Sequence, residues 1–148
     1  MKITTSWQGG MKFELEAGEN RALMDAPSPI GSGSSPSPKQ ILLGAICACS
    51  GIDIAARMKK NRLELKSLRI EADAAKREGS PSTFDSVLLD FFFEGSLPEE
   101  LVMESVRISQ SEECGVSAMI AAHCPIHYRV HLNEKMLGTG ESRFFQKR

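Results

Sequence analysis

The stretch that decides the fold is residues 37–60, which read SPKQILLGAICACSGIDIAARMKK. The pattern predicts one long helix, because the Ser37 hydroxyl can cap the first turn and Pro38 suits the first helical position. Basic residues gather in the last four positions, where cations favour the negative end of the helix dipole. Nearly every side chain between these ends is apolar or small, which is typical of a helix buried on all sides.

Composition limits the settings in which this helix can lie. Cys, Ser and Asp interrupt its apolar run before it reaches the roughly 18 to 20 residues that a membrane span needs, so we expect no membrane. The sequence therefore places the helix in the core of a soluble domain or at a subunit interface. A length of 148 residues matches one domain, and a net charge of −1 gives no electrostatic reason to bind nucleic acid.

The N-terminal residues and the cysteines point to a cellular compartment. Residues 1–7 lack the apolar core of a secretion signal, so the sequence predicts a cytoplasmic protein. In that compartment, the four cysteines are expected to be reduced, catalytic or metal-bound rather than paired in a disulfide framework.

The chain before the helix alternates in polarity and is predicted to form a short antiparallel meander. Turn residues separate its strands, which we expect over residues 2–7, 11–16 and 21–24. Residues 26–38 are rich in Ser, Pro and Gly and are predicted to form a loop without a core of its own. This loop leads directly into the long helix, so we expect it to wrap over the site that the helix builds.

The chain after the helix predicts a hairpin, two helices and a last strand. These elements are expected over residues 65–76, 84–93, 96–111, 116–123 and 126–133. The strand at 84–93 is apolar on both faces, which indicates a central or covered strand. The tail at 138–148 is assigned no element. The order βββ-α-ββ-α-α-β groups strands apart from helices, so we predict an α+β fold and a single domain over residues 1–148.

Two cysteines stand out by their positions. Cys49 lies in the middle of the long helix and shares a face with Asp53, while Cys47 points to roughly the opposite side. The two helical cysteines cannot pair with each other, so an oxidised Cys49 needs a partner from elsewhere, and Cys114, beside Gly115 at a helix break, suits that role. The alternative is that these cysteines are inert core residues, and the Asp53 carboxylate disfavours a Cys49 thiolate.

The chain resembles the OsmC/Ohr family at two motifs. The first is the central-helix signature, here Ser37-Pro38-x-x-x-Leu42-Leu43-x-Ala45-x-x-x-Cys49-Ser50-x-x-Asp53. The second is a cysteine followed by a small-residue helix, here Cys114-Gly115-Val116-Ser117-Ala118. The order of the predicted elements is also similar to the family's. The resemblance implies an OsmC-like fold with a long buried central helix and an intertwined homodimer whose active sites lie near the subunit interface.

The resemblance also implies a thiol-dependent peroxidase that acts on organic hydroperoxides in oxidative-stress defence. Carried over by position, Cys49 would be the peroxidatic cysteine that becomes a sulfenic acid. Cys114 would be the resolving cysteine that condenses with it to a disulfide. A dithiol or lipoyl-type reductant would restore both thiols, and no cofactor is implied.

One feature of the family's peroxidases is missing from this sequence. They usually carry a Glu just after the helix-opening Pro, which orients an Arg toward the thiolate, whereas Lys39 and Gln40 stand there in this chain. A cation near a thiol lowers its pKa, so Lys12, Arg21 or Lys39 is expected to serve, and the sequence does not choose among them. The departure favours an alternative function: a dimer of the same fold with little peroxidase activity that binds a small apolar or thiol-reactive ligand between its subunits.

A histidine cluster offers a rival site near the C-terminus, where residues 123–131 contain all three histidines and Cys124. On a strand, His127 and His131 would share a face but stand about 13 Å apart, which is too far for one metal ion. We therefore predict no metal site. Arg129 and these two histidines are expected to face solvent, and His123 and Cys124 are expected to close the preceding helix.

Overall fold

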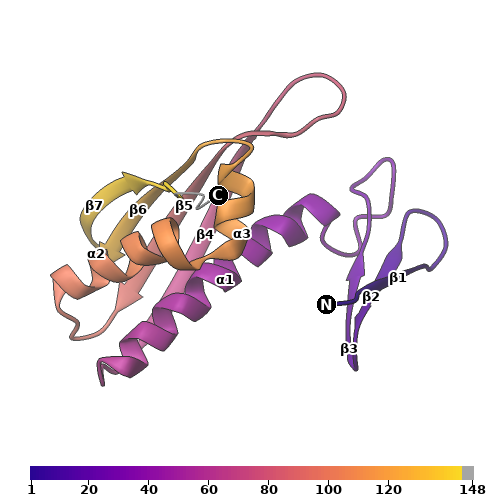
Figure 1. Cartoon of the computed structure of the whole chain (residues 1–148). Coiled ribbons are helices and arrows are strands. Elements are labelled where there is room, and N and C mark those ends of the chain that lie inside the picture. The colour runs from indigo at the N-terminus through magenta and orange to yellow at the C-terminus, as the bar shows by residue number, and fades with distance from the viewer. Residues whose placement is uncertain (145–148) are drawn as a thin grey trace. The chain divides into compact units, whose positions relative to one another are not determined.

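The structure is a computed structural model that describes residues 1–144. Its elements in chain order are β1 (Thr4–Trp7), β2 (Phe13–Ala17), β3 (Asn20–Met24), α1 (Pro38–Lys60), β4 (Ser67–Lys76), β5 (Phe84–Glu94), α2 (Glu99–Ile108), the π-helix η1 (Ser109–Glu113), α3 (Gly115–Ala121), β6 (Ile126–Leu132) and β7 (Lys135–Glu141) (Figure 1). The predicted α+β fold is confirmed. The chain divides into two compact units, Met1–Gly44 and Ala45–Arg148. The single domain stays a prediction.

The first unit is the predicted three-stranded meander, in which β2 pairs with both β1 and β3. Gly18 turns the chain between β2 and β3 at a φ of 63°, a conformation that glycine adopts without strain. Asp25 is the only buried residue among residues 1–44, all of which are described. Both faces of this sheet therefore remain uncovered within one chain.

The long helix has the bounds that the sequence predicts, and it begins with a reciprocal cap. The backbone N–H of Ser37 donates to the Gln40 side chain at 2.8 Å, and the N–H of Gln40 donates to the Ser37 hydroxyl at 3.4 Å. Within one chain the helix is buried only along a stripe, which consists of Ile46, Ser50, Ile54 and Met58. Ile52, on another face, is 69% exposed.

The prediction that α1 is buried on all sides therefore does not hold within a single chain. The helix is long and apolar enough to cross a membrane by length and composition, a test that core helices of soluble proteins also pass. All four residues of its buried stripe belong to the second unit. The exposed apolar faces of α1 remain the part that a single chain leaves uncovered.

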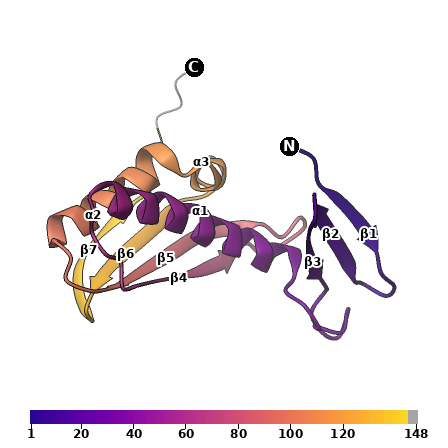
Figure 2. The same cartoon turned by 90° about the horizontal axis from the view of Figure 1, so that it is seen from below.

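The second unit is a four-stranded sheet in the order β4-β5-β6-β7 with helices on one face (Figure 2). β5 lies between β4 and β6, as its apolar faces predict. β5 and β6 are parallel, so the chain must cross over between them, and α2, η1 and α3 form that crossover. The core lies between sheet and helices, where Phe91, Phe93, Val130, Val102 and Val106 are fully or almost fully buried.

Two parts of the second unit differ from the expectation. The helix predicted over residues 96–111 is α2 followed by the π-helix η1, because five residues rather than four span its last turn. Strand β7 was not predicted, since Gly138 and Gly140 interrupt the alternation of its side chains. It takes in the first part of the tail at 138–148, and residues 145–148 lie outside the described residues.

Candidate functional site

The structure brings Cys49 and Cys114 together, although they are far apart in the sequence. Cys49 comes from the middle of α1, and Cys114 stands between η1 and α3. The two sulfur atoms and a carboxylate oxygen of Asp53, one turn along α1, all lie within 4.8 Å of one another. All four cysteines are free, and Cys47 is not part of this group.

Local backbone geometry positions Cys114. Its N–H donates to the Ser109 carbonyl five residues earlier, at 3.0 Å, which closes the π-turn. Its side chain then caps α3 by accepting the backbone N–H of Ser117 at 3.3 Å. Cys114 is completely buried. A π-turn inside a helical segment is rare and is found often at functional sites, and here it delivers a cysteine sulfur to the central helix.

A buried chain of polar side chains leads to the Cys114 sulfur. The Ser142 hydroxyl donates to the Gln110 side-chain oxygen at 2.8 Å, and the Gln110 amide donates to the Ser50 hydroxyl at 2.7 Å. Ser50 in turn donates to the Cys114 sulfur at 3.4 Å. The side chains of Ser142, Gln110 and Ser50 are thereby all paired, which ties α1, η1 and the segment after β7 to one sulfur atom.

The environment of Cys49 favours its protonated form. Burial is the largest cause that raises the pKa of its thiol above the usual value, and the neighbouring Cys114 and Asp53 raise it further. The backbone N–H of Val116 acts in the opposite direction by hydrogen-bonding the sulfur. The net effect is a raised pKa of the Cys49 thiol, as the sequence predicts for a cysteine beside the Asp53 carboxylate.

Asp53 is held in place by the π-helix. The Ser109 hydroxyl donates to one of its carboxylate oxygens at 3.0 Å. Burial raises the pKa of Asp53, an effect that this hydrogen bond opposes and that Glu113 adds to. One turn further along α1, Arg57 forms an ion pair with Glu113 at 2.5 Å, so the guanidinium is engaged by a carboxylate next to Cys114.

The side chains of Ser109, Gln110 and Ser142 were not predicted as part of the site. A signal for two of them exists in the sequence, since Val102, Ser105, Val106, Ser109 and Gln110 recur at the spacing of one helix face, and all are buried. Two polar residues at the end of an apolar face indicate a polar cluster inside the fold. Ser142 carries no such signal, because β7 itself was not recognised.

The three cations proposed to activate Cys49 all belong to the first unit. Arg21 forms ion pairs with Glu14 and Glu16 within its own sheet, the shorter at 2.9 Å. Lys39 lies in the first turn of α1, and Lys12 precedes β2. Their role at the thiol stays a prediction.

Among residues 1–144, the group of three ligating side chains that lie close together is the one around Cys49, and the histidines do not belong to it. The expectation that His131 faces solvent is wrong. Its ring stacks on Phe92 at 4.6 Å and lies 3.2 Å from the Asp90 carboxylate, which also binds Arg129. His123 and Cys124 close α3 as expected, since both N–H groups donate to the Ile120 carbonyl.

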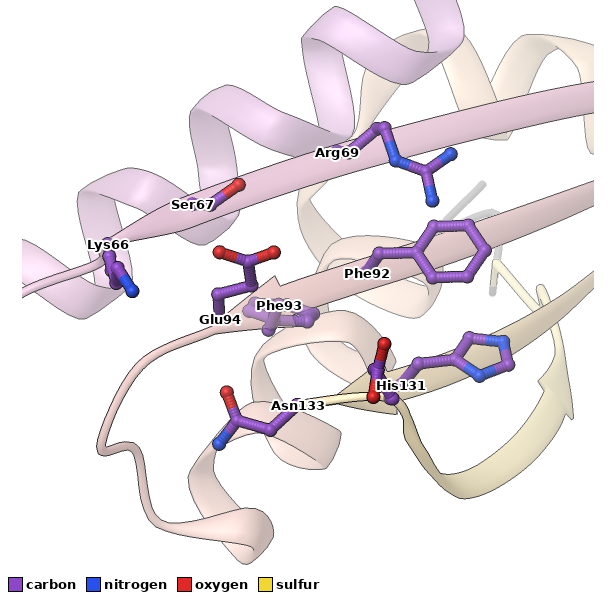
Figure 3. A pocket seen from close by; sticks show the side chains of 9 residues that line it. Lys66, Ser67, Arg69, Phe92, Phe93, Glu94, His131 and Asn133 are labelled. Atoms are coloured by element: carbon purple, nitrogen blue, oxygen red, sulfur yellow. The ribbon is translucent and has the colours of Figure 1, made fainter.

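A hollow of about 610 Å³ lies on the sheet and contains none of the cysteines. Figure 3 shows Arg69 above the Phe92 ring, with His131 beyond it. The guanidinium carbon lies 4.0 Å from the ring centre, a cation–π contact. Arg69, Phe92 and His131 thus contact one another, and we assign the hollow no function.

Comparisons with family models, with curated proteins and with solved structures all match the chain to the same protein family. The family described as OsmC-like protein matches residues 31–129. Protein YhfA of Escherichia coli K12 is 29% identical over 122 residues, which are 81% of this chain and 89% of YhfA.

Two solved structures illustrate the fold. An OsmC-like protein from Mycoplasma pneumoniae is 12% identical and has a TM-score of 0.78, covering 88% of this chain and 95% of its own. An organic hydroperoxide resistance protein, OsmC, from Legionella pneumophila is 16% identical with a TM-score of 0.65, covering 89% of this chain and 96% of its own. At these identities the likeness concerns the fold.

Proposed function

Because the chain belongs to the OsmC-like protein family, we propose that it is a thiol-dependent peroxidase that reduces organic hydroperoxides in the cytoplasm. The observation that carries the proposal is the pair of free cysteines, the half-buried Cys49 and the buried Cys114, whose sulfurs lie within 4.8 Å of each other. The name of the Legionella neighbour, a hydroperoxide resistance protein, supports the choice of substrate class.

The proposed reaction uses the two sulfurs in order. The Cys49 thiolate attacks the peroxide, so that an S–O bond forms, the O–O bond breaks and the alkoxide takes a proton to leave as an alcohol. The Cys114 thiol then attacks the sulfenic sulfur, an S–S bond forms, and the hydroxyl leaves as water with the Cys114 proton. A dithiol or lipoyl-type reductant returns two electrons by thiol–disulfide exchange.

The spacing of the sulfurs suits this sequence of steps. A disulfide bond is about 2.05 Å long, so closure from 4.8 Å or less needs a shift of under about 3 Å. Cys114 begins a seven-residue helix after a π-turn, where the backbone can adjust more easily than in the middle of α1. This adjustment at Cys114, together with rotation of the half-buried Cys49 side chain, would supply the movement.

We further propose a homodimer. A three-stranded sheet needs a covering layer to be stable, and the first unit buries only Asp25 among its residues. The α1 helix likewise keeps large apolar side chains such as Ile52 exposed. A second copy that covers these surfaces would complete both layers, and it would bring another set of Lys12, Arg21 and Lys39 to the assembly.

A second candidate function is favoured by one observation. Burial, Cys114 and Asp53 all raise the pKa of Cys49, which leaves less thiolate to attack a peroxide at neutral pH. The alternative is a dimer with little peroxidase activity that binds a small apolar or thiol-reactive ligand between its subunits. Rapid turnover of an alkyl hydroperoxide by the purified protein excludes this alternative.

The deciding experiment measures consumption of an alkyl hydroperoxide with a dithiol reductant. We expect Cys49→Ser to abolish turnover, and Cys114→Ser to allow one oxidation that leaves a sulfenic acid at Cys49, detected by a sulfenic-acid-specific reagent and mass spectrometry. Cys47→Ser is the matched control, since Cys47 is on α1 but outside the site, and it should keep the wild-type rate. A wild-type rate no higher than that of Cys49→Ser overturns the proposal.

A further inference from the structure

We propose that the reduced site binds one zinc ion through the sulfurs of Cys49 and Cys114 and the carboxylate of Asp53. The three donors come from two segments that the fold brings together and lie within 4.8 Å of one another. Zinc binds thiolate, imidazole and carboxylate ligands, and sites with three protein ligands keep a fourth position for water. The binding itself is independent of peroxidase activity, whereas its coupling to oxidation, argued below, rests on the proposed function.

The spacing of the donors is close to what zinc requires. With Zn–S distances of about 2.3 Å and Zn–O distances of about 2.1 Å, tetrahedral geometry separates two sulfurs by about 3.8 Å and a sulfur from an oxygen by about 3.6 Å. The observed donors lie within 4.8 Å, so a shift of about 1 Å closes the site. Rotation of the half-buried side chains of Cys49 and Asp53 can supply that shift while the buried Cys114 stays in place.

Charge also favours a divalent cation at this position. Two thiolates and one carboxylate carry three negative charges, and zinc reduces the total to −1. Arg57, the basic side chain that follows Asp53 on the same helix, is already paired with Glu113 at 2.5 Å. The hard, oxygen-preferring cations Mg²⁺ and Ca²⁺ do not suit two sulfur ligands, whereas zinc does.

A metal site also needs hydrogen bonds that orient its ligands and a path by which the ion enters, and the surroundings of the three donors provide both. The Ser109 hydroxyl holds one carboxylate oxygen of Asp53 at 3.0 Å and leaves the other oxygen for a metal ion. Ser50 and the Ser117 backbone N–H likewise orient the Cys114 sulfur. A hollow of about 290 Å³, lined by Asp53, Ala56, Arg57, Lys60 and Glu113, borders the carboxylate and gives an ion a path from solvent.

Zinc binding and disulfide formation exclude each other, because both use the same two sulfurs. A hydroperoxide that oxidises the loaded site takes two electrons from the two thiolates. The S–S bond forms, the O–O bond breaks, the alkoxide and hydroxide take two protons from the buffer to leave as an alcohol and water, and Zn²⁺ is released. The site would then hold zinc when reduced and release it on oxidation, so that zinc competes with the peroxide for the thiolates.

Cobalt(II) is the probe for the test, since a thiolate–cobalt bond absorbs light where zinc does not. Full-length reduced protein, freed of metal with a chelator, is titrated with Co²⁺ without oxygen. We expect a thiolate-to-cobalt band that saturates at about one ion per chain and that Zn²⁺ abolishes. Asp53→Asn should weaken binding at least about tenfold, and Cys49→Ser should lose much of the band. Cys47→Ser and Asp73→Asn, outside the site, should match wild type.

Two results would overturn the metal site. One is the absence of the band in reduced wild-type protein that circular dichroism shows to be folded. The other is a loss in Cys47→Ser as large as that in Cys49→Ser. Asp53→Asn keeps the test valid if a cysteine variant fails to fold, because Asp53 is only half-buried.

The link to oxidation is tested separately by adding one equivalent of an alkyl hydroperoxide. Loss of the cobalt band in step with a Cys49–Cys114 disulfide, read by mass spectrometry, supports the switch. A disulfide that forms while the band persists overturns it. If metal-free protein is not oxidised at all, the proposed peroxidase fails while the cobalt titration still decides the metal site.

Discussion

At the scale of single residues, the charged groups near each sulfur affect the pKa of its thiol. Cys49 shares its helix face with Asp53, and the carboxylate is one of the causes that raise the pKa of the thiol. The same carboxylate is the third donor for zinc. One residue thus slows the attack of the free thiol and supplies a ligand when a cation is present.

Removing the charge of Asp53 should make Cys49 more reactive. Asp53→Asn keeps the size of the side chain but removes a cause of the raised pKa, so more thiolate is present at neutral pH. We expect faster alkylation of Cys49 by iodoacetamide at pH 7 in chelator-treated protein, with the site read by mass spectrometry. Asp73→Asn, at an exposed position of β4, is the control. An unchanged rate in Asp53→Asn contradicts the assigned electrostatic effect.

A different carboxylate, Asp25, organises the loop that leads into α1. It accepts hydrogen bonds from the backbone and hydroxyl groups of Ser32 and Ser34, and these bonds, that of the Ser32 hydroxyl first, lower its pKa to about 2. Gly31 packs so closely here that an added Cβ would lie 2.7 Å from the Asp25 carboxylate and 2.3 Å from a backbone oxygen.

The low pKa of Asp25 predicts a pH dependence of the loop. Because the folded value lies below the usual 3.8, the stabilisation is fully present above about pH 4 and is lost as the pH falls toward 2. We expect the Ser32 and Ser34 amides to be protected from hydrogen exchange at pH 5 and to lose protection only as the pH falls below about 2, after correction for intrinsic rates. In Asp25→Asn the protection should no longer depend on pH in this window; equal pH dependence in both proteins contradicts the assignment.

At the scale of elements, the π-helix η1 links the layers around the site. Its Gln110 side chain joins Ser50 on α1 to Ser142 after β7, and its carbonyl accepts the N–H of Arg143 at 3.2 Å. Gln110 is completely buried, so its hydrogen bonds have no solvent alternative.

Loss of the Gln110 side chain should therefore destabilise the fold. Gln110→Ala leaves the buried Ser50 and Ser142 hydroxyls without this partner, at a cost of about 2 to 4 kcal/mol. We expect a matching fall in the free energy of unfolding, measured by urea denaturation. Glu112→Ala on the exposed side of the same element should change it by less than about 0.5 kcal/mol. Similar small effects of both substitutions would show that the network carries little stability.

The glycines of β7 allow β6 to approach closely. A Cβ at Gly140 would lie 2.3 Å from the Tyr128 ring, whereas a Cβ at Gly138 would meet the end of the flexible Met103 side chain at 2.9 Å. We expect Gly140→Ala to lower the free energy of unfolding by about 1 to 3 kcal/mol and Gly138→Ala to cost less, because the tyrosine ring cannot move aside as the methionine can. Thermal denaturation of both variants checks the order, and a reversed order contradicts it.

At the scale of the whole molecule, one chain leaves apolar surface uncovered on both units. The α1 face that carries Ile52 and the sheet of the first unit bury little within a single chain. The proposed dimer would cover the apolar face of α1 that carries Ile52. It also allows the active site to receive a cation from another copy.

A charge at the exposed face of α1 should break the dimer. Ile52→Glu places a carboxylate where the proposed partner packs, and we expect the dissociation constant to rise at least about 100-fold, or about 3 kcal/mol. Sedimentation equilibrium measures it. The same change at Met136, exposed on β7, should leave association unchanged. A wild-type protein that is monomeric at micromolar concentration contradicts the proposed dimer.

Local patterns in the sequence were enough to predict most elements and the family. The bounds of α1 follow from its cap, its proline and its basic end, and β5 is central because both of its faces are apolar. These features depend on neighbours in the chain, so periodicity and capping rules are able to detect them. The relation between Cys49 and Cys114 was instead implied by the resemblance of their two motifs to the OsmC/Ohr family.

Only the tertiary structure decided the surroundings of those cysteines. The π-turn at Ser109–Glu113, the buried contacts of Gln110 and the meeting of Asp53 with Cys114 depend on residues that are distant in sequence. Strand β7 exists because β6 supplies its hydrogen bonds and Tyr128 fills the space above Gly140. Local sequence patterns cannot predict these contacts, because the contacts lower the free energy of the protein only after the elements have packed together.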